Sequence, residues 1–68
     1  MKAKLNIMNL IKIMAEREIT QKKLSDLSGV SRQTICLSFA RKSCALVTAG
    51  KLAEGLGVDV SEVIMEED

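Results

Sequence analysis

The chain has 68 residues, of which 47% are apolar and 28% are charged, with four glycines and no proline. This length and composition favour one small globular domain, leave little room for a deep active-site cleft and exclude a low-complexity disordered chain. With one Phe and neither Tyr nor Trp, the chain lacks the aromatic residues on which single-strand nucleic-acid binders stack bases.

Charge is distributed unevenly, although the net charge is only +1. Residues 17–51 carry seven basic and two acidic side chains, whereas residues 52–68 carry six acidic side chains and no basic one. A polyanion would therefore be attracted to the middle of the chain and repelled by its C-terminal part. A solvated surface without a partner is the alternative, and charge alone does not decide between the two.

Several function classes are disfavoured by what the sequence lacks. No apolar run reaches the roughly 18 residues of a membrane span, so we expect a cytoplasmic protein without a signal peptide. Cys36 and Cys44 are expected to be reduced thiols, because two cysteines without histidine form neither a metal pattern nor a disulfide framework. Without histidine or a Gly-rich phosphate loop, we expect no enzyme and no metal, cofactor or small-molecule ligand.

Apolar residues at helical spacing predict a first helix over residues 6–17. Its core face is expected to hold Leu10, Ile13 and Met14. The apolar arc is wide, which leaves Met8 and Ile11 either to cover the neighbouring helix or to take part in a dimer.

A second helix is predicted over residues 21–28, with Thr20 as its N-cap and with Leu24 and Leu27 facing inward.

A tight turn separates this helix from a third one that begins at Ser31, which is expected to be its N-cap. When two short helices cross steeply, the crossing needs a small residue, the turn needs a positive φ, and an apolar side chain must fill the angle. Ser25, Gly29 and Ile35 stand at the offsets that suit these three roles.

A short connection over residues 40–45 is expected to lead into a fourth helix over residues 46–56. Gly57 should end that helix as a left-handed C-cap, and Gly50 within it indicates either close packing or a weak point.

Asp59 and Glu62 have the spacing of a capping box for a fifth, short helix, and residues 65–68 are expected to fray. The expected fold is therefore all-α, a compact bundle of about five short helices forming one domain over residues 1–68.

Two segments resemble the Cro and lambda-repressor type of helix-turn-helix proteins, the Xre-like family. ITQKKLSDLSGVSRQTI, from Ile19 to Ile35, resembles the DNA-reading unit, and TAGKLAEGLGVDVSEVI, from Thr48 to Ile64, resembles the helices that close the five-helix domain. The resemblance covers about residues 10–64. It implies a lambda-repressor-like fold and a transcriptional regulator, expected to be a repressor, that reads specific sequences of double-stranded DNA.

The resemblance also implies that the third helix enters the major groove by its N-terminal end, which makes Arg32 and Gln33 candidates for contacts to base edges. Arg suits the O6 and N7 acceptors of guanine, and Gln suits N7 and N6 of adenine. Leu37, one turn beyond Gln33, is expected either to lie against a thymine methyl or to be an ordinary exposed leucine.

Phosphate contacts are expected on both sides of this helix. The family uses the residue matching Gln21 in this way, and Ser31 and Thr34 are interpreted as phosphate or capping groups. Other basic residues, Lys23, Arg41 and Lys51, are interpreted as surface charges. The candidates for phosphate contact are Gln21, Lys22, Ser31, Thr34, Lys42 and Ser43.

The sequence departs from the family pattern at three places. Glu18 stands where a glycine usually ends the first helix, and Ser38 occupies a position that is usually apolar. The connection after the third helix has Arg41 and Cys44 where the family has a glycine and a proline.

A homodimer is expected, because one recognition helix reads only a few base pairs. The subunits would pair through their helix ends or through Val63, Ile64 and Met65. An alternative function is a protein-interaction module, such as an antitoxin, whose main partner is a protein. The polar start of the third helix argues against this alternative, because a protein interface favours apolar anchors.

Overall fold

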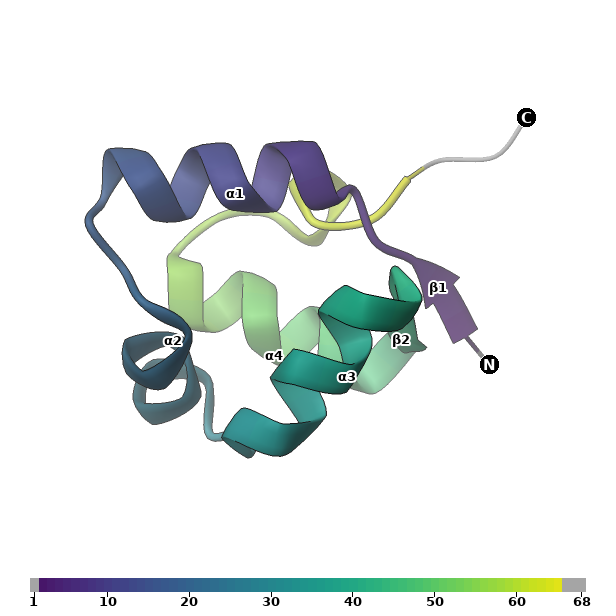
Figure 1. Ribbon diagram of the computed structural model, residues 1–68. Coiled ribbons are helices and arrows are strands. Elements are labelled where there is room, and N and C mark those ends of the chain that lie inside the picture. The colour runs from purple at the N-terminus through teal and green to yellow at the C-terminus, as the bar shows by residue number, and fades with distance from the viewer. Residues whose placement is uncertain (1, 66–68) are drawn as a thin grey trace.

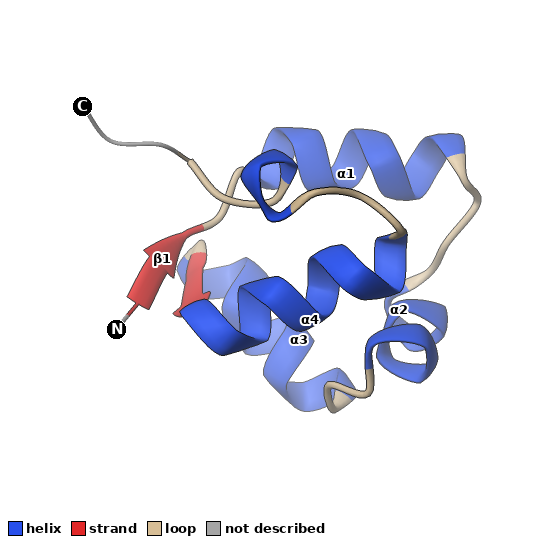
Figure 2. Ribbon diagram, turned by 180° about the vertical axis from the view of Figure 1, so that it is seen from behind, coloured by secondary structure: helices blue, strands red, loops and turns tan. Residues whose placement is uncertain are grey.

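The computed structural model of the protein describes residues 2–65. α1 lies along one side of the molecule, α2 and α3 lie along the other, and α4 packs behind them (Figures 1 and 2). No helix among the described residues is long and apolar enough to cross a membrane. In chain order the elements are β1 (Lys2–Lys4), α1 (Ile7–Glu16), α2 (Gln21–Ser28), α3 (Arg32–Arg41), β2 (Ser43–Ala45), α4 (Leu46–Leu56) and a 3-10 helix, η1 (Val60–Glu62).

The first three helices begin at a polar side chain that accepts a hydrogen bond from the backbone N–H three residues later. The distances are 3.2 Å for Asn6, 3.1 Å for Thr20 and 3.2 Å for Ser31. Because these caps satisfy N–H groups that the helix itself leaves without partners, they determine where each helix starts. The predicted second helix and its N-cap are confirmed, and the first helix is confirmed to within one residue at each end.

A small antiparallel sheet, which the all-α prediction missed, joins the two strands. Lys2 lies opposite Ala45, Ala3 opposite Cys44 and Lys4 opposite Ser43. These three-residue strands are too short to show an alternating pattern, and they pair segments far apart in the chain, so nothing local in the sequence indicates them.

The end of the described chain lies against the other edge of β1, on the side of the molecule away from α2 (Figure 2). Leu5 forms an isolated antiparallel bridge with Ile64, and the Met65 N–H donates to the Lys4 carbonyl at 2.8 Å. The prediction that the chain frays from Met65 is therefore wrong at this residue, while residues 66–68 lie outside the described part. Val63 is fully buried, so the prediction that its side chain forms a dimer interface is wrong.

The predicted fifth helix is a single 3-10 turn. The Asp59 carboxylate accepts hydrogen bonds from the backbone N–H of Ser61 at 3.1 Å and from its hydroxyl at 2.6 Å, instead of forming the expected box with Glu62. These bonds hold the pKa of Asp59 below its ordinary value of 3.8, because they favour the ionised carboxylate.

The predicted fourth helix is confirmed as α4, but the predicted connection over residues 40–45 is shorter, because α3 continues to Arg41, and it contains β2. Lys42 ends α3 with a φ of 58°, and its carbonyl accepts a 2.9 Å hydrogen bond from the Leu5 N–H. Glu18, where the family has glycine, has a φ of 55°. The chain therefore takes the left-handed turn that glycine favours at both positions, with a residue that carries a Cβ.

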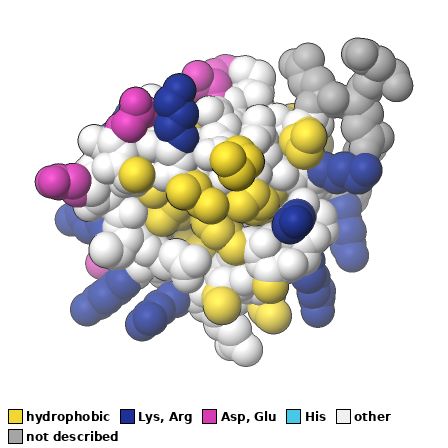
Figure 3. Space-filling view, turned by 45° about the horizontal axis from the view of Figure 1, so that its top comes forward, with side chains coloured by type: hydrophobic (Ala, Val, Ile, Leu, Met, Phe, Trp, Pro, Cys, Tyr) yellow, Lys and Arg dark blue, Asp and Glu magenta, His cyan; other side chains and the backbone are white. Residues whose placement is uncertain are grey.

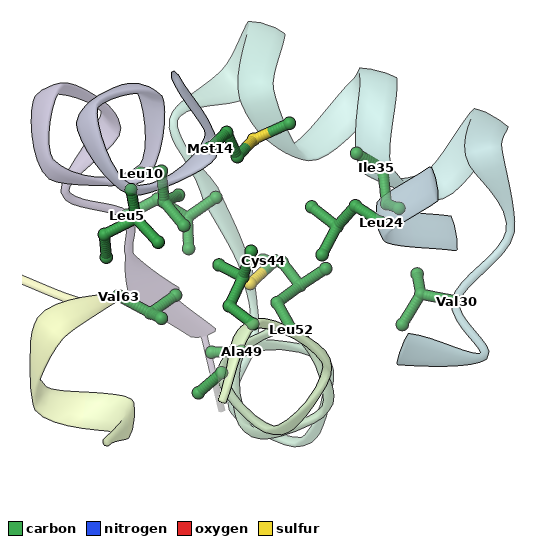
Figure 4. Packing of buried hydrophobic residues seen from close by; sticks show 13 residues of the cluster. Leu5, Leu10, Met14, Leu24, Val30, Ile35, Cys44, Ala49, Leu52 and Val63 are labelled. Carbon is green, nitrogen blue, oxygen red and sulfur yellow. The ribbon is translucent and has the colours of Figure 1, made fainter. Parts of the chain in front are cut away.

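The core collects buried side chains from the helices α1 to α4 and from β2, together with Leu5, Val30 and Val63 from connecting segments, packed around α4 (Figure 4). The inward positions predicted for Leu10, Ile13 and Met14 are confirmed. Leu24 and Ile35 are fully buried, whereas Leu27 is 47% exposed and the prediction that it faces inward is wrong.

A close approach between α2 and α4 explains the position of Leu27. A Cβ added to Gly55 would lie 2.9 Å from the backbone of Ser28, so α2 contacts α4 through Ser28. A Cβ added to Gly50 would meet nothing within 4 Å. Close packing, the first of the two explanations considered for Gly50, is therefore wrong. Gly57 has a φ of 73° and confirms the predicted C-cap of α4.

Candidate nucleic-acid interface

The angle between α2 and α3 is determined by the turn that joins them. Gly29 has a φ of 75°, which confirms its predicted role. The Ser25 hydroxyl donates to the Val30 carbonyl at 2.6 Å, and the Val30 N–H donates to the Ser28 hydroxyl at 3.2 Å. Ile35 fills the angle between the helices and is fully buried, as predicted. The turn thus satisfies its own polar groups and holds α3 in one orientation.

The N-terminal end of α3 projects into solvent. Arg32 and Gln33 are both exposed, and Leu37 is 46% exposed one turn later. Ser31 caps the helix through the Thr34 N–H, and its hydroxyl also donates to the Thr34 hydroxyl oxygen at 2.7 Å. The three candidates for base contact therefore lie on the outside of a capped, well-anchored helix.

The first residues of α2 provide a second polar end. Gln21 is half-buried and Lys22 is exposed. Because the Thr20 side chain takes the N–H of Lys23, the N–H groups of Gln21 and Lys22 have no partner within the helix. Such N–H groups, together with the helix dipole, favour an anion such as a phosphate.

Ser38, which departs from the family pattern, is 5% exposed and keeps its hydroxyl satisfied by donating to the Thr34 carbonyl at 2.7 Å. Two other phosphate candidates follow α3: Lys42 is exposed in its left-handed turn, and Ser43 is half-buried in β2.

A hollow with a volume of about 240 Å³ lies beside the C-terminal part of α3. It brings together the predicted site residues Thr34, Leu37 and Ser43, while the other predicted site residues lie outside it. Its wall is formed by Lys2, Thr34, Leu37, Ser38, Arg41, Ser43, Cys44, Ala45 and Thr48.

Two basic residues line this hollow: Arg41, interpreted from the sequence as a surface charge, and Lys2, which the sequence did not single out. The seven-residue spacing from Thr34 to Arg41 places both on one side of α3, and this signal was present in the sequence. No local signal indicates Lys2, because only the pairing of β1 with β2 brings it opposite Ala45.

Charge is separated over the surface of the molecule. In Figure 3, Lys and Arg side chains gather along the lower edge and the right side, whereas most Asp and Glu side chains lie toward the upper left. A group of hydrophobic side chains occupies the centre of the same face. Further hydrophobic side chains lie between the basic ones at the lower edge.

Both cysteines are free thiols, Cys36 exposed on α3 and Cys44 buried. Burial raises the pKa of the Cys44 thiol, and a hydrogen bond with the backbone of Ala49 partly opposes that rise. Within residues 2–65, no three His, Cys, Asp or Glu side chains are grouped as a metal site.

Comparison with protein families matches residues 9–66 to the model described as the Cro/C1-type HTH DNA-binding domain. Comparisons with curated proteins and with solved structures gave no match. The match spans most of the chain and includes the turn at Gly29, the exposed start of α3 and the closing helix α4. The protein therefore belongs to the family of Cro/C1-type helix-turn-helix DNA-binding domains.

Proposed function

We propose that the protein is a transcriptional repressor that reads specific sequences in double-stranded DNA with the N-terminal end of α3. The observation that carries this proposal is the pair Arg32 and Gln33, exposed at the start of a helix whose other side is anchored by the fully buried Ile35. An α-helix fits the major groove, where Arg and Gln can each form two hydrogen bonds to one base.

The role of Leu37 follows from its position one turn along the same helix. Its side chain is 46% exposed, so it can lie against the methyl group of a thymine without any rearrangement of the core.

Contacts to phosphates would position α3 in the groove. Gln21 and Lys22 begin α2 with free N–H groups, and Lys42 lies just beyond α3. Ser31 and Thr34 already bond one another, which leaves the Thr34 hydroxyl hydrogen available to a phosphate oxygen. With about five such contacts per subunit, affinity for DNA should fall steeply as salt rises.

Selection of bound sites from a random duplex pool tests the proposal. We expect an enriched sequence made of two related half-sites about one helical turn apart, because a twofold dimer presents two copies of α3. A pool that shows no enrichment would overturn sequence-specific recognition.

Two substitutions then separate base contacts from phosphate contacts. Arg32→Ala should relax the preference at one base pair, a loss of about 1–3 kcal/mol of discrimination. Lys22→Ala should weaken binding to all duplexes by a similar factor. Equal losses on every duplex from both variants would contradict these roles.

Homodimer formation is part of the proposal. The longest dimension of one subunit is 31 Å, whereas half-sites one turn apart are separated by about 34 Å, so a single α3 does not reach both. Met8 and Ile11 are 80% and 53% exposed, but they lie on α1, on the side of the molecule opposite α3 (Figure 1), where a dimer contact would hold the two copies of α3 apart. Met65, 54% exposed beside β1, supports the C-terminal segment as the contact between subunits.

Sedimentation of the purified protein tests the dimer. We expect a dimer for the wild type and a monomer for the variant Met65→Gln. Val47→Gln serves as the control, because Val47 is 72% exposed but lies on α4. A wild-type monomer at high concentration would remove the dimer and leave DNA binding intact.

A further inference from the structure

The hollow beside α3 has the chemistry of an anion site. Two of its side chains, Lys2 and Arg41, are cationic, and no Asp or Glu is part of its wall. Four of the other residues in its wall carry hydroxyl groups, namely Thr34, Ser38, Ser43 and Thr48.

At least one of these hydroxyls has a hydrogen available to donate. The Thr34 oxygen accepts from Ser31, so its own hydrogen remains free, whereas the Ser38 hydroxyl is used by the Thr34 carbonyl. A phosphate oxygen is a strong acceptor, and charge-assisted hydrogen bonds from Arg to phosphate are stronger than neutral ones.

The position of the hollow suggests which anion it meets. Thr34, Leu37 and Arg41 lie along one side of α3, and the opposite wall is built by β2 and the start of α4. The major groove is only slightly wider than an α-helix, so the two sugar-phosphate strands run close along the sides of an inserted helix. A strand on this side would pass over the hollow.

We propose that the hollow holds a phosphodiester group of the bound DNA, with Lys2 and Arg41 as its cationic contacts. This inference rests on the proposed function and adds β1 to the DNA-binding surface. The N-terminal strand thereby contributes to binding through its pairing with β2, which carries Lys2 to the start of α4.

The salt dependence of binding measures the contact directly. The probe is a mixed-sequence duplex two helical turns long, about 20 base pairs, titrated with wild type, Lys2→Gln, Arg41→Gln and the double variant. The loss of one phosphate contact should reduce the slope of log K against log salt by about 0.9. We expect a smaller reduction in each single variant and the full reduction of about 0.9 in the double variant, because either residue alone still holds part of the contact with the same phosphate.

Lys12→Gln is the matched control, since Lys12 is exposed on α1 and loses the same charge away from the hollow. If the slopes for Lys2→Gln and Arg41→Gln equal the control slope, the inference is wrong. The proposed function is tested separately by Lys22→Ala, which removes a phosphate contact at the start of α2. A wild-type protein that binds no duplex would overturn both the inference and the proposed function. Thermal unfolding shows whether each variant is folded. If Arg41→Gln unfolds, the slope measured with Lys2→Gln tests the inference, because Lys2 is exposed and its replacement should leave the fold intact.

A free anion is the other source of the same chemistry. If millimolar inorganic phosphate raised the Tm of the wild type but not of Lys2→Gln, while the DNA slopes stayed unchanged, the hollow would belong to a small anion and the proposal would be wrong.

Discussion

The helix-turn-helix unit, residues 21–41, and the terminal unit, formed by β1, β2 and the chain around Val63, are held together in different ways. In the first, each stabilising side-chain bond joins residues two to five positions apart, as between Ser25 and Val30. In the second, the Asn6 N–H donates to the Val63 carbonyl at 2.8 Å, and the Asn9 side chain donates to the Glu62 carbonyl at 2.6 Å.

The difference shows that the unit with the candidate base contacts is locally encoded, whereas the unit that positions Lys2 depends on the closure of the whole chain. Local bonds form at a small entropic cost, while closing a chain of some 50 residues requires the rest of the fold to be in place. Both units nevertheless pack on the same core around α4 (Figure 4).

The largest effect should come from truncating the core of each unit. Ile35→Ala and Leu5→Ala should each lower the free energy of unfolding by about 2–5 kcal/mol, because both side chains are almost completely buried. Urea unfolding measures both, with the exposed Met8→Ala as the control. A loss below about 1 kcal/mol for Leu5→Ala would show that the terminal unit is not part of the cooperative fold.

A pair of glycines in α4 tests how the helix-turn-helix unit sits on that helix. Gly55→Ala should destabilise the protein by about 1–3 kcal/mol, because the new Cβ would lie 2.9 Å from the backbone of Ser28. Gly50→Ala should stabilise it by about 1 kcal/mol, since the added methyl meets no atom within 4 Å. Thermal unfolding of both variants separates the effect of the close approach between α4 and α2 from the general helix propensity of alanine. A Gly55→Ala variant that is more stable than the wild type would contradict the close approach.

Glu18 and Lys42, the two residues other than glycine with a positive φ in the described part of the chain, lie near the ends of the helix-turn-helix unit. Replacing either by glycine should change stability in the same way but change DNA binding differently. Glu18→Gly and Lys42→Gly should each stabilise the protein by up to about 1 kcal/mol, because glycine adopts a positive φ without steric cost. Only Lys42→Gly should weaken binding to duplex DNA, since it removes a proposed phosphate contact. Equal binding by both variants would remove Lys42 from the interface.

The smallest effect concerns pH and the terminal unit, where Cys44 lies in β2. Burial raises the pKa of the Cys44 thiol above its ordinary value of 9.0, so the folded state keeps a proton that the unfolded state loses. The free energy of unfolding should therefore fall as pH rises above about 9.0 and be unaffected by this group below it. Urea unfolding of Cys44→Ala should show a weaker alkaline decline; an identical decline would assign the effect elsewhere.

Much of the candidate site was predictable because its signals lie close together in the chain. Caps at Thr20 and Ser31, the left-handed Gly29 and the buried Ile35 each depend on a few neighbouring residues. Leu27 was misplaced, because the same helical spacing suits a core face and an exposed one, and the contact between Ser28 and Gly55 decided between them.

By itself, the sequence determined the helices, their caps and the turn that orients α3, since hydrogen bonds and periodic apolar positions within a short segment specify these features. Only the tertiary structure decided the pairing of β1 with β2, the burial of Val63 and the placement of Lys2 and Arg41 in the wall of one hollow beside α3. The reason is physical: these features bring together segments separated by tens of residues, whose pairing gains free energy only after the core around α4 has formed.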